Sequence, residues 1–297
     1  MLPWTTAHAR QDEARAWAYP AFCQWSPVDH TYVQGLASSG PGFLCKCLGG
    51  DQGGKVLPGS VVSGTGLPFK RMHFMCSTKP CAWPKLLYGT VGVCHQLANR
   101  GLEPVGATVY QARGYGLSFV LYGAYGRLNA VTLPFAMYLC RKKAPKGGQK
   151  KSLSPQVRLF RGFADSLLKI APQLSAGQII GRHRAYSRDA LNLRMEQTIP
   201  GAGVSKFQFV MNLWHRVQQS LDQIWAEFGN GIIANQEISK PYVNRLDALV
   251  RSVQTDLAEV LSPEEYFNFL RLPYPKSKRD LASWRDFVDP NGPVRLP

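Results

Sequence analysis

From residue 154 onward, apolar residues recur every three or four positions, which is the period of an amphipathic α-helix. Ser154 and Ser262 each precede a proline, an arrangement that supplies an N-cap and a favourable first helical residue. Ser187 is the expected cap of another helix, and Gly229 is the expected end of the longest one. The pattern predicts a bundle with short connections, whose helices begin near residues 155, 188, 205, 241, 263 and 277.

Residues 104–140 follow a different pattern, with three runs of β-branched and aromatic residues separated by glycine-containing turns. The runs are "ATVYQA", "LSFVLYGA" and "NAVTLPFAMYL", and they predict a small antiparallel meander. Residues 22–101 are rich in Gly, Pro and Ser and lack a helical period, which is typical of loops and short strands. Nearer the start, residues 5–19 predict a short helix capped by Thr5 or Thr6.

The stretch "CRKKAPKGGQKKSLSP" at residues 140–155 combines basic charge with glycine and proline, and we interpret it as a linker or basic loop between two domains. The predicted fold is α+β. A basic, Gly-rich mixed domain with a small antiparallel sheet, which zinc could staple, occupies residues 1–150, and a helical bundle occupies residues 151–297. No apolar run reaches the roughly 18–20 residues that span a bilayer, and no signal peptide is recognisable, so we expect a cytoplasmic protein without a membrane partner.

The net charge of +16 is distributed unevenly along the chain. Residues 31–161 hold 17 of the 35 basic side chains but only two of the 19 acidic ones, Asp51 and Glu103. So few anions predict a polyanionic partner, most commonly a nucleic-acid backbone, although a basic face can also serve only solubility. The candidate nucleic-acid-binding residues are Lys70, Arg71, Lys79, Lys85, Arg113, Arg127, Arg141, Lys142, Lys143, Lys146, Lys150, Lys151, Arg182 and Arg184.

Two close cysteine pairs, Cys45 with Cys47 and Cys76 with Cys81, are candidate ligands for one zinc ion. Structural zinc is usually held by two pairs with two to four residues between the partners, a range that the second pair fits. The single residue within the first pair strains chelation by both sulfurs. The pattern therefore leaves two alternatives, a zinc site or buried thiols. Substitute ligands nearby in sequence are His73, Cys94 and His95.

Candidate chemistry is sparse in the basic segment. Two-metal nucleases need several converging carboxylates, which residues 31–161 lack. Metal-independent RNA cleavage needs only a histidine base beside cations, and His73 or His183 could supply it. Five aromatic residues are interleaved with Arg113 and Arg127 and could stack on bases, although packing beneath the helices is the favoured alternative. They are Tyr110, Tyr115, Phe119, Tyr122 and Tyr125.

The order of motifs in residues 43–95 resembles that of the large subunit of type IV CRISPR effector complexes. A cysteine pair is followed by Gly-Gly in "FLCKCLGG", then by a Gly/Ser-rich loop, the basic-aromatic stretch "LPFKRMHFMC" and a second cysteine pair. Overall size and charge agree with the resemblance. The family pattern uses CxxC-like pairs, from which both pairs of this chain depart in spacing.

The resemblance implies a non-catalytic subunit of a prokaryotic ribonucleoprotein. Such a subunit contacts the 5′ end of the guide RNA and the other effector subunits, and it recognises the motif beside the target in double-stranded DNA to start strand opening, while a separate helicase acts later. Two alternatives stay open: a metal-independent endoribonuclease that processes guide RNA, and a stand-alone DNA-binding protein of a plasmid or conjugative element.

The basic loop generates the first prediction. Charge reversal at Lys142, Lys143, Lys146 and Lys150 should weaken duplex DNA binding and flatten its salt dependence, because fewer counterions are released. Binding measured by fluorescence anisotropy across a salt series tests this. An unchanged salt slope would remove the loop from the interface.

Overall fold

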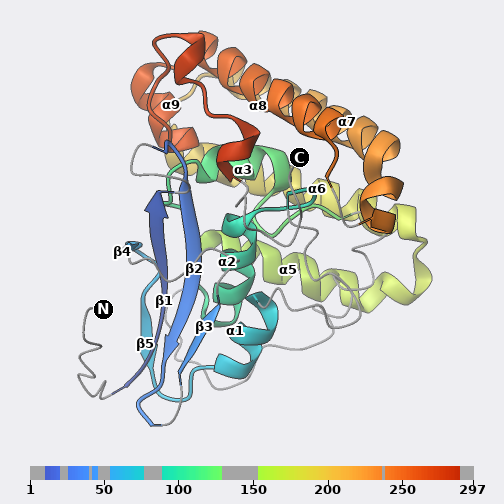
Figure 1. Ribbon diagram of the computed structural model, residues 1–297. Helices are drawn as coiled ribbons and strands as arrows, with labels where there is room; N and C mark the ends of the chain where they lie inside the picture. Colours follow the sequence, from blue (N-terminus) through green and yellow to red (C-terminus); the bar gives the residue numbers. More distant parts are fainter. Residues whose placement is uncertain are drawn as a thin grey trace.

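A five-stranded antiparallel sheet lies at one side of the molecule, and helices cover its inner face (Figure 1). The computed structural model describes residues 11–20, 26–39, 42–45, 54–76, 89–128, 153–235 and 238–287. The mixed α+β class is confirmed. In the described part of the chain, no helix combines the length and apolar character needed to cross a membrane.

The sheet is built around a long hairpin. Strands β1 (Asp12–Pro20) and β2 (Asp29–Leu36) pair antiparallel along their whole length, with Trp17 opposite Tyr32. Short strands complete the sheet: β3 (Phe43–Cys45) pairs with β2, and β4 (Lys55–Val56) and β5 (Val62–Gly64) pair with β1. Short strands were expected in this part of the chain.

The helix predicted over residues 5–19 is wrong from Asp12 onward, where the chain forms β1. The burial pattern along β1 explains the difference. Buried alanines at 14, 16 and 18 alternate with larger, partly exposed side chains. Ala, Arg and Glu are good helix formers, so their intrinsic propensity favours a helix here even though the apolar positions repeat every two residues. Packing of the alanine face against the helices favours a strand over a helix in this segment.

Two helices cover the sheet where loops and short strands were expected. Helix α1 (Phe69–Cys76) lies against β3, and α2 (Cys94–Leu102) lies against β2 (Figure 1). The helical period of α2 is hidden in the sequence because all of its residues are buried, the polar ones included.

The predicted meander is wrong at its middle run, which forms helix α3 (Tyr115–Tyr122). A short apolar run has no period that separates a buried helix from a buried strand, and α3 is buried on all sides. Gly114 and Gly123, both with positive φ, bound the helix and allow sharp turns at its ends. The first run forms no strand, and the third lies outside the described residues.

The chain from residue 154 is helical, as predicted. Ser154 and Ser262 are the N-caps of α5 and α9, since each hydroxyl accepts a hydrogen bond from the backbone three residues on. The helices are α5 (Pro155–Ile170), α6 (Ala176–Thr198), α7 (Val204–Asn235), α8 (Lys240–Val260) and α9 (Pro263–Leu270).

Three expected boundaries in this region are wrong. Ser187 lies inside α6, which begins earlier at a capping box between Ser175 and Gln178. Helix α7 continues past Gly229 to Asn235, so that glycine is not a C-cap. The last predicted helix is reduced to two 3-10 turns, η3 (Lys278–Asp280) and η4 (Trp284–Phe287).

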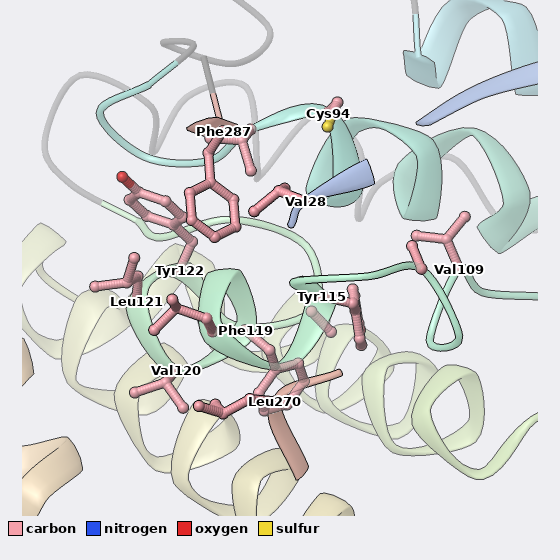
Figure 2. Packing of buried hydrophobic residues seen from close by; sticks show 14 of the residues in the cluster. Val28, Cys94, Val109, Tyr115, Phe119, Val120, Leu121, Tyr122, Leu270 and Phe287 are labelled. Carbon is pink, nitrogen blue, oxygen red and sulfur yellow. The ribbon is translucent and has the colours of Figure 1, made fainter. Parts of the chain in front are cut away.

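One hydrophobic cluster contains side chains from both predicted domains, from Ala14 of β1 to Phe287 of η4. Helix α3 lies within this cluster, and Figure 2 shows Phe119 and Leu121 on it together with Leu270 and Phe287 from the C-terminal part. The boundary predicted near residue 150 lies outside the described residues. Residues from both sides of that boundary pack together in this one cluster.

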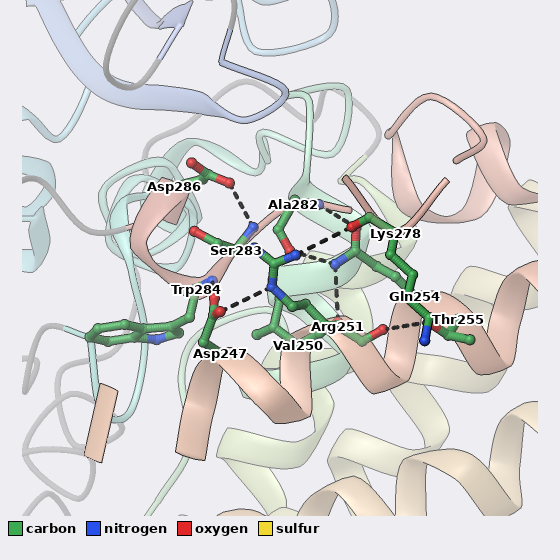
Figure 3. A network of polar contacts seen from close by, with 10 residues as sticks. All are labelled: Asp247, Val250, Arg251, Gln254, Thr255, Lys278, Ala282, Ser283, Trp284 and Asp286. Atoms are coloured by element: carbon green, nitrogen blue, oxygen red, sulfur yellow. Dashed lines mark hydrogen bonds and ion pairs between the residues drawn. The ribbon is translucent and has the colours of Figure 1, made fainter. Parts of the chain in front are cut away.

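Hydrogen bonds fix the C-terminal turns to α8 (Figure 3). Gln254 donates to the Ala282 carbonyl at 2.7 Å and accepts from its amide at 2.9 Å, while Asp247 accepts from the Trp284 amide at 2.9 Å. The buried indole of Trp284 then donates to the Tyr122 hydroxyl at 3.0 Å, which links the end of the chain to α3.

The close approach of α3 to α9 generates a stability prediction. A Cβ atom on Gly116 would lie 1.9 Å from the Phe269 carbonyl oxygen. Gly116→Ala should therefore lower the free energy of unfolding by about 3 kcal/mol or more, because neither backbone can move freely. Gly162→Ala on α5 is the matched control, since nothing lies within 4 Å of its Cβ position. It should raise stability by about 0.5–1 kcal/mol. Urea unfolding measures both, and equal effects would contradict the packing.

Candidate nucleic-acid interface and a neighbouring cavity

The layer formed by α7, α8 and α9 is largely neutralised by its own ion pairs. Two of them cross between α7 and α8, and a third joins α7 to α9. The pairs are Arg216 with Asp256, Arg245 with Glu227, Lys206 with Glu265, and Arg251 with Asp247 within α8. Most of these groups are solvent-exposed or partly so, and each pair contributes little to stability, but together they leave this face with little excess charge.

Two candidate arginines of the basic segment are compensated by acids from outside it. Arg113 pairs with Asp29 at 2.8 Å, and Arg127 pairs with Asp222 of α7 at 2.7 Å. Asp222 also contacts Arg184. Counting charges along residues 31–161 could not show these partners, because Asp222 is 95 residues away from Arg127 in sequence.

Glu103 compensates two further arginines. Its carboxylate, which is almost fully buried, accepts from Arg161 at 2.7 Å and contacts Arg71 at 3.4 Å. Arg71 is therefore a half-buried structural residue, in contrast to its exposed neighbour Lys70. The scarcity of acids in residues 31–161 predicts that this segment needs an external anion. For Arg71 and Arg161 that prediction does not hold, because Glu103 of the same segment compensates them.

Exposed cations without a carboxylate within ion-pair distance occur in several places in the described residues, among them Lys55, Lys70, Lys240, Lys276, Lys278, Arg279 and Arg285. Three more lie together on the hairpin formed by α5 and α6. Arg158, Lys169 and Arg182 are exposed and have no carboxylate within ion-pair distance in the described part of the chain. We call these three residues the hairpin cations. The sequence places Arg182 and Arg184 just before the start of a helix. They lie within α6 instead, because that helix starts at Ala176.

Many of the candidate nucleic-acid-binding residues lie outside the described residues, so the structure does not test them. These are Lys79, Lys85, Arg141, Lys142, Lys143, Lys146, Lys150 and Lys151. In the sequence, Lys151 lies four residues before Pro155, the first residue of α5.

Only part of the predicted zinc site lies within the described residues. Cys47 and Cys81 lie outside the described residues, as do the side chains of Cys45 and Cys76. The ring of Phe43 on β3 contacts His73 on α1, so the two pairs begin on neighbouring elements. No group of three potential metal ligands occurs in the described ranges. A zinc site therefore stays a prediction.

Neither Cys94 nor His95 is available as a substitute zinc ligand, because both are enclosed in the core. The two ring nitrogens of His95 are hydrogen-bonded, one to the Ser118 hydroxyl at 2.9 Å and the other to the Asp29 carbonyl at 3.0 Å. This correction follows from the burial of α2.

The two histidines considered as general bases differ in environment. His183 is buried against Phe163 and Tyr186, and burial, together with nearby arginines, lowers its pKa to about 3. A base with so low a pKa is a poor match for catalysis near neutral pH. His73 is exposed on α1.

The tyrosines proposed as stacking surfaces are mostly core residues. Tyr115, Tyr122 and Tyr125 are buried, so the packing alternative is confirmed for them. Tyr110 differs, with 38% of its surface exposed.

Tyr110 lines a cavity of about 370 Å³ that sequence reasoning missed. The cavity lies between the start of α5, the last turns of α6 and the residue after α9. Its walls are formed by Thr108, Tyr110, Tyr115, Ser154, Pro155, Gln156, Arg194, Gln197, Thr198 and Arg271. A volume in this range accommodates a small organic ligand.

The buried guanidinium of Arg194 dominates the electrostatics of the cavity. Arg194 is 3% exposed, donates through Nε to the Phe269 carbonyl at 3.1 Å, and stacks over the Tyr115 ring at 5.1 Å. Burial lowers its pKa to about 10, Tyr115 opposes this change, and the positive charge of Arg271 adds to it. Arg194 therefore remains a desolvated cation at neutral pH.

Two weak sequence signals point to this cavity. Arg194 occupies an apolar phase of α6, three residues after buried Leu191 and next to buried Met195. Arg271 follows directly on α9, where glycine or asparagine is usual, and it has positive φ.

Comparison with known proteins adds no assignment. No family model matches the chain, and neither a curated protein nor a solved structure is significantly similar to it.

Proposed function

We propose that the protein binds nucleic acid without catalysing a reaction, as a subunit of a ribonucleoprotein complex. The observation that carries the proposal is the spatial separation of charge. The α7–α8 face is neutralised by ion pairs, whereas the hairpin cations have no described carboxylate partner. A phosphate backbone along the α5–α6 hairpin would supply the missing anions and release condensed counterions.

The resemblance of residues 43–95 to type IV CRISPR large subunits supports a more specific form of the proposal. The nucleic acids are then guide RNA and double-stranded target DNA, and the partners are the other effector subunits together with a helicase. The near-neutral α7–α8 face suits protein contacts better than phosphate contacts, because protein interfaces are much less cationic than nucleic-acid interfaces.

A non-catalytic role is favoured by the engagement of the described acids that lie beside the arginines of the basic segment. Asp29, Glu103 and Asp222 each form ion pairs with arginines, which leaves these carboxylates poorly placed for metal binding or proton transfer. His183 is enclosed. The endoribonuclease alternative therefore depends on His73, and RNA cleavage that is abolished in His73→Ala would favour it.

Removal of the hairpin cations tests the proposed surface. The triple variant Arg158→Gln, Lys169→Gln, Arg182→Gln should weaken duplex DNA and RNA binding and reduce the slope of log affinity against log salt by about 2–3, or roughly 0.9 per lost phosphate contact. Fluorescence anisotropy at several salt concentrations measures both quantities.

The matched control removes the same charge from the opposite layer. Arg216→Gln, Lys240→Gln, Arg245→Gln should change affinity and slope much less, because Arg216 and Arg245 are already paired. Equal losses in the two triple variants would mean that only net charge matters, and the hairpin would then not be a binding surface.

Copurification tests the ribonucleoprotein form of the proposal. Protein isolated from its native host should retain a defined RNA of guide length and partner subunits, identified by sequencing and mass spectrometry. Isolation with DNA alone, or with no nucleic acid and no partner, would favour the stand-alone DNA-binding alternative.

A further inference from the structure

The cavity at the start of α5 contains two cations without a described counterion. Neither Arg194 nor Arg271 has a carboxylate within ion-pair distance among the described residues, and the positive charge of Arg271 helps to lower the pKa of Arg194. Bringing two guanidinium groups together in a largely desolvated site is unfavourable unless an anion joins them. The stacking of Arg194 on Tyr115 offsets only part of this cost.

The first turn of α5 adds to the positive potential of the same cavity. Ser154, Pro155 and Gln156 line it, at the start of the 16-residue helix α5. Proline has no N–H and the Ser154 hydroxyl caps the Val157 amide, so the Gln156 amide is the first-turn donor left for an anion. The partial positive charge of this helix end favours an anion, and phosphate is the anion most often held in this way.

Two buried polar atoms on the walls lack a partner and restrict the ligand further. Nε of Arg271 is an unpaired donor, and Oε1 of Gln156 is an unpaired acceptor on a side chain that is 6% exposed. A phosphate dianion can satisfy the donor, but it cannot donate to Gln156. The ligand therefore needs a hydroxyl or amino group in addition to its anionic group.

Size and aromatic character complete the description. A cavity of about 370 Å³ is far larger than inorganic phosphate needs, and the rings of Tyr110 and Tyr115 form part of its wall. Aromatic side chains stack on nucleobases without sequence preference. A nucleotide carries all three features: a phosphate, hydroxyl or amino donors, and a flat ring.

The backbone at Arg271 supports a role beyond structure. With φ of 58° and ψ of 36°, this residue is the only described non-glycine residue with positive φ. The conformation costs an L-residue about 1 kcal/mol or more relative to glycine. Arginine at a position that favours glycine is explained if its side chain is needed in the cavity.

We propose that this cavity binds a nucleoside monophosphate unit, with Arg194, Arg271 and the first turn of α5 around the phosphate and Gln156 accepting from the sugar or base. The unit could be a free nucleotide or the phosphorylated end of a strand. The inference does not depend on the proposed function, because a free nucleotide could occupy the cavity in a protein that binds no polymer.

Two variants should weaken binding, and the first should do so without lowering stability. Arg271→Gly deletes the guanidinium and relieves the backbone, so the melting temperature should stay equal or rise. Gln156→Glu keeps the side-chain shape and repels phosphate, but it also removes the 3.2 Å hydrogen bond from Gln156 Nε2 to the Ala190 carbonyl, so its melting temperature is measured alongside binding. Each should weaken binding of adenosine 5′-monophosphate at least tenfold, measured by isothermal titration calorimetry. The control Arg216→Gln removes one exposed charge elsewhere and should bind as the unaltered protein does.

Ligand comparisons decide the chemistry. Adenosine 5′-monophosphate should bind at least tenfold more tightly than adenosine or inorganic phosphate. If inorganic phosphate bound equally well, or if both variants bound the nucleotide as the unaltered protein does, the proposed site would be wrong. An absence of nucleotide binding to the unaltered protein would also overturn it.

Oligonucleotides distinguish the two sources of the nucleotide. A strand with a 5′-phosphate should bind more tightly than the same strand with a 5′-hydroxyl, and Arg271→Gly should abolish the difference, if the cavity holds a strand end. Equal binding of the two strands, together with tight binding of the mononucleotide, assigns the site to a free nucleotide. The triple variant of the hairpin cations should retain nucleotide binding, which separates failure of this site from failure of the proposed surface.

Discussion

The buried polar face of α2 is the constraint on which the rest of the structure depends. Gln96, Asn99 and Arg100 donate hydrogen bonds of 2.9, 2.8 and 2.7 Å to the carbonyl oxygens of the consecutive residues 123–125. The side-chain oxygen Oδ1 of Asn99 also accepts from the Val109 amide at 2.8 Å. Because α2 is buried along its whole length, each of these groups would otherwise carry a desolvation cost of about 1–3 kcal/mol. The chain on both sides of α3 is therefore held in one conformation.

That conformation determines where the cavity forms. Asn99 also contacts the hydroxyl of Tyr115 at 3.0 Å, which fixes the ring on which Arg194 stacks. One residue further on, Gly116 allows α3 to approach the backbone of α9, whose Phe269 carbonyl accepts from Arg194. A core hydrogen-bond network thus positions a desolvated cation at the wall of a cavity, through packing that admits no larger side chain at Gly116.

The sequence predicts an element well where the signal is local. Ser154 and Ser262 begin helices because their hydroxyls cap amides three residues away, an interaction that is complete within one turn. Helix α3 and strand β1 could not be predicted in this way, because burial against distant elements decides between helix and strand in short runs. The cavity depends on residues from four distant segments, and only the apolar phase of Arg194 and the unusual position of Arg271 mark it in the sequence.

The distribution of unpaired charge is a second property that could not be predicted from the sequence alone. A count along the chain assigns the positive excess to residues 31–161, yet Arg113 and Arg127 there are paired with acids that the count placed elsewhere. Two of the three hairpin cations, Lys169 and Arg182, come from the half that seemed neutral, because its acids are used by α7, α8 and α9. Since ion pairing is decided in space, the surface that attracts a polyanion is defined by which cations the fold leaves without a partner. In the described part of this chain two of those cations, Arg158 and Lys169, lie on α5, the helix whose first turn forms a wall of the arginine-lined cavity.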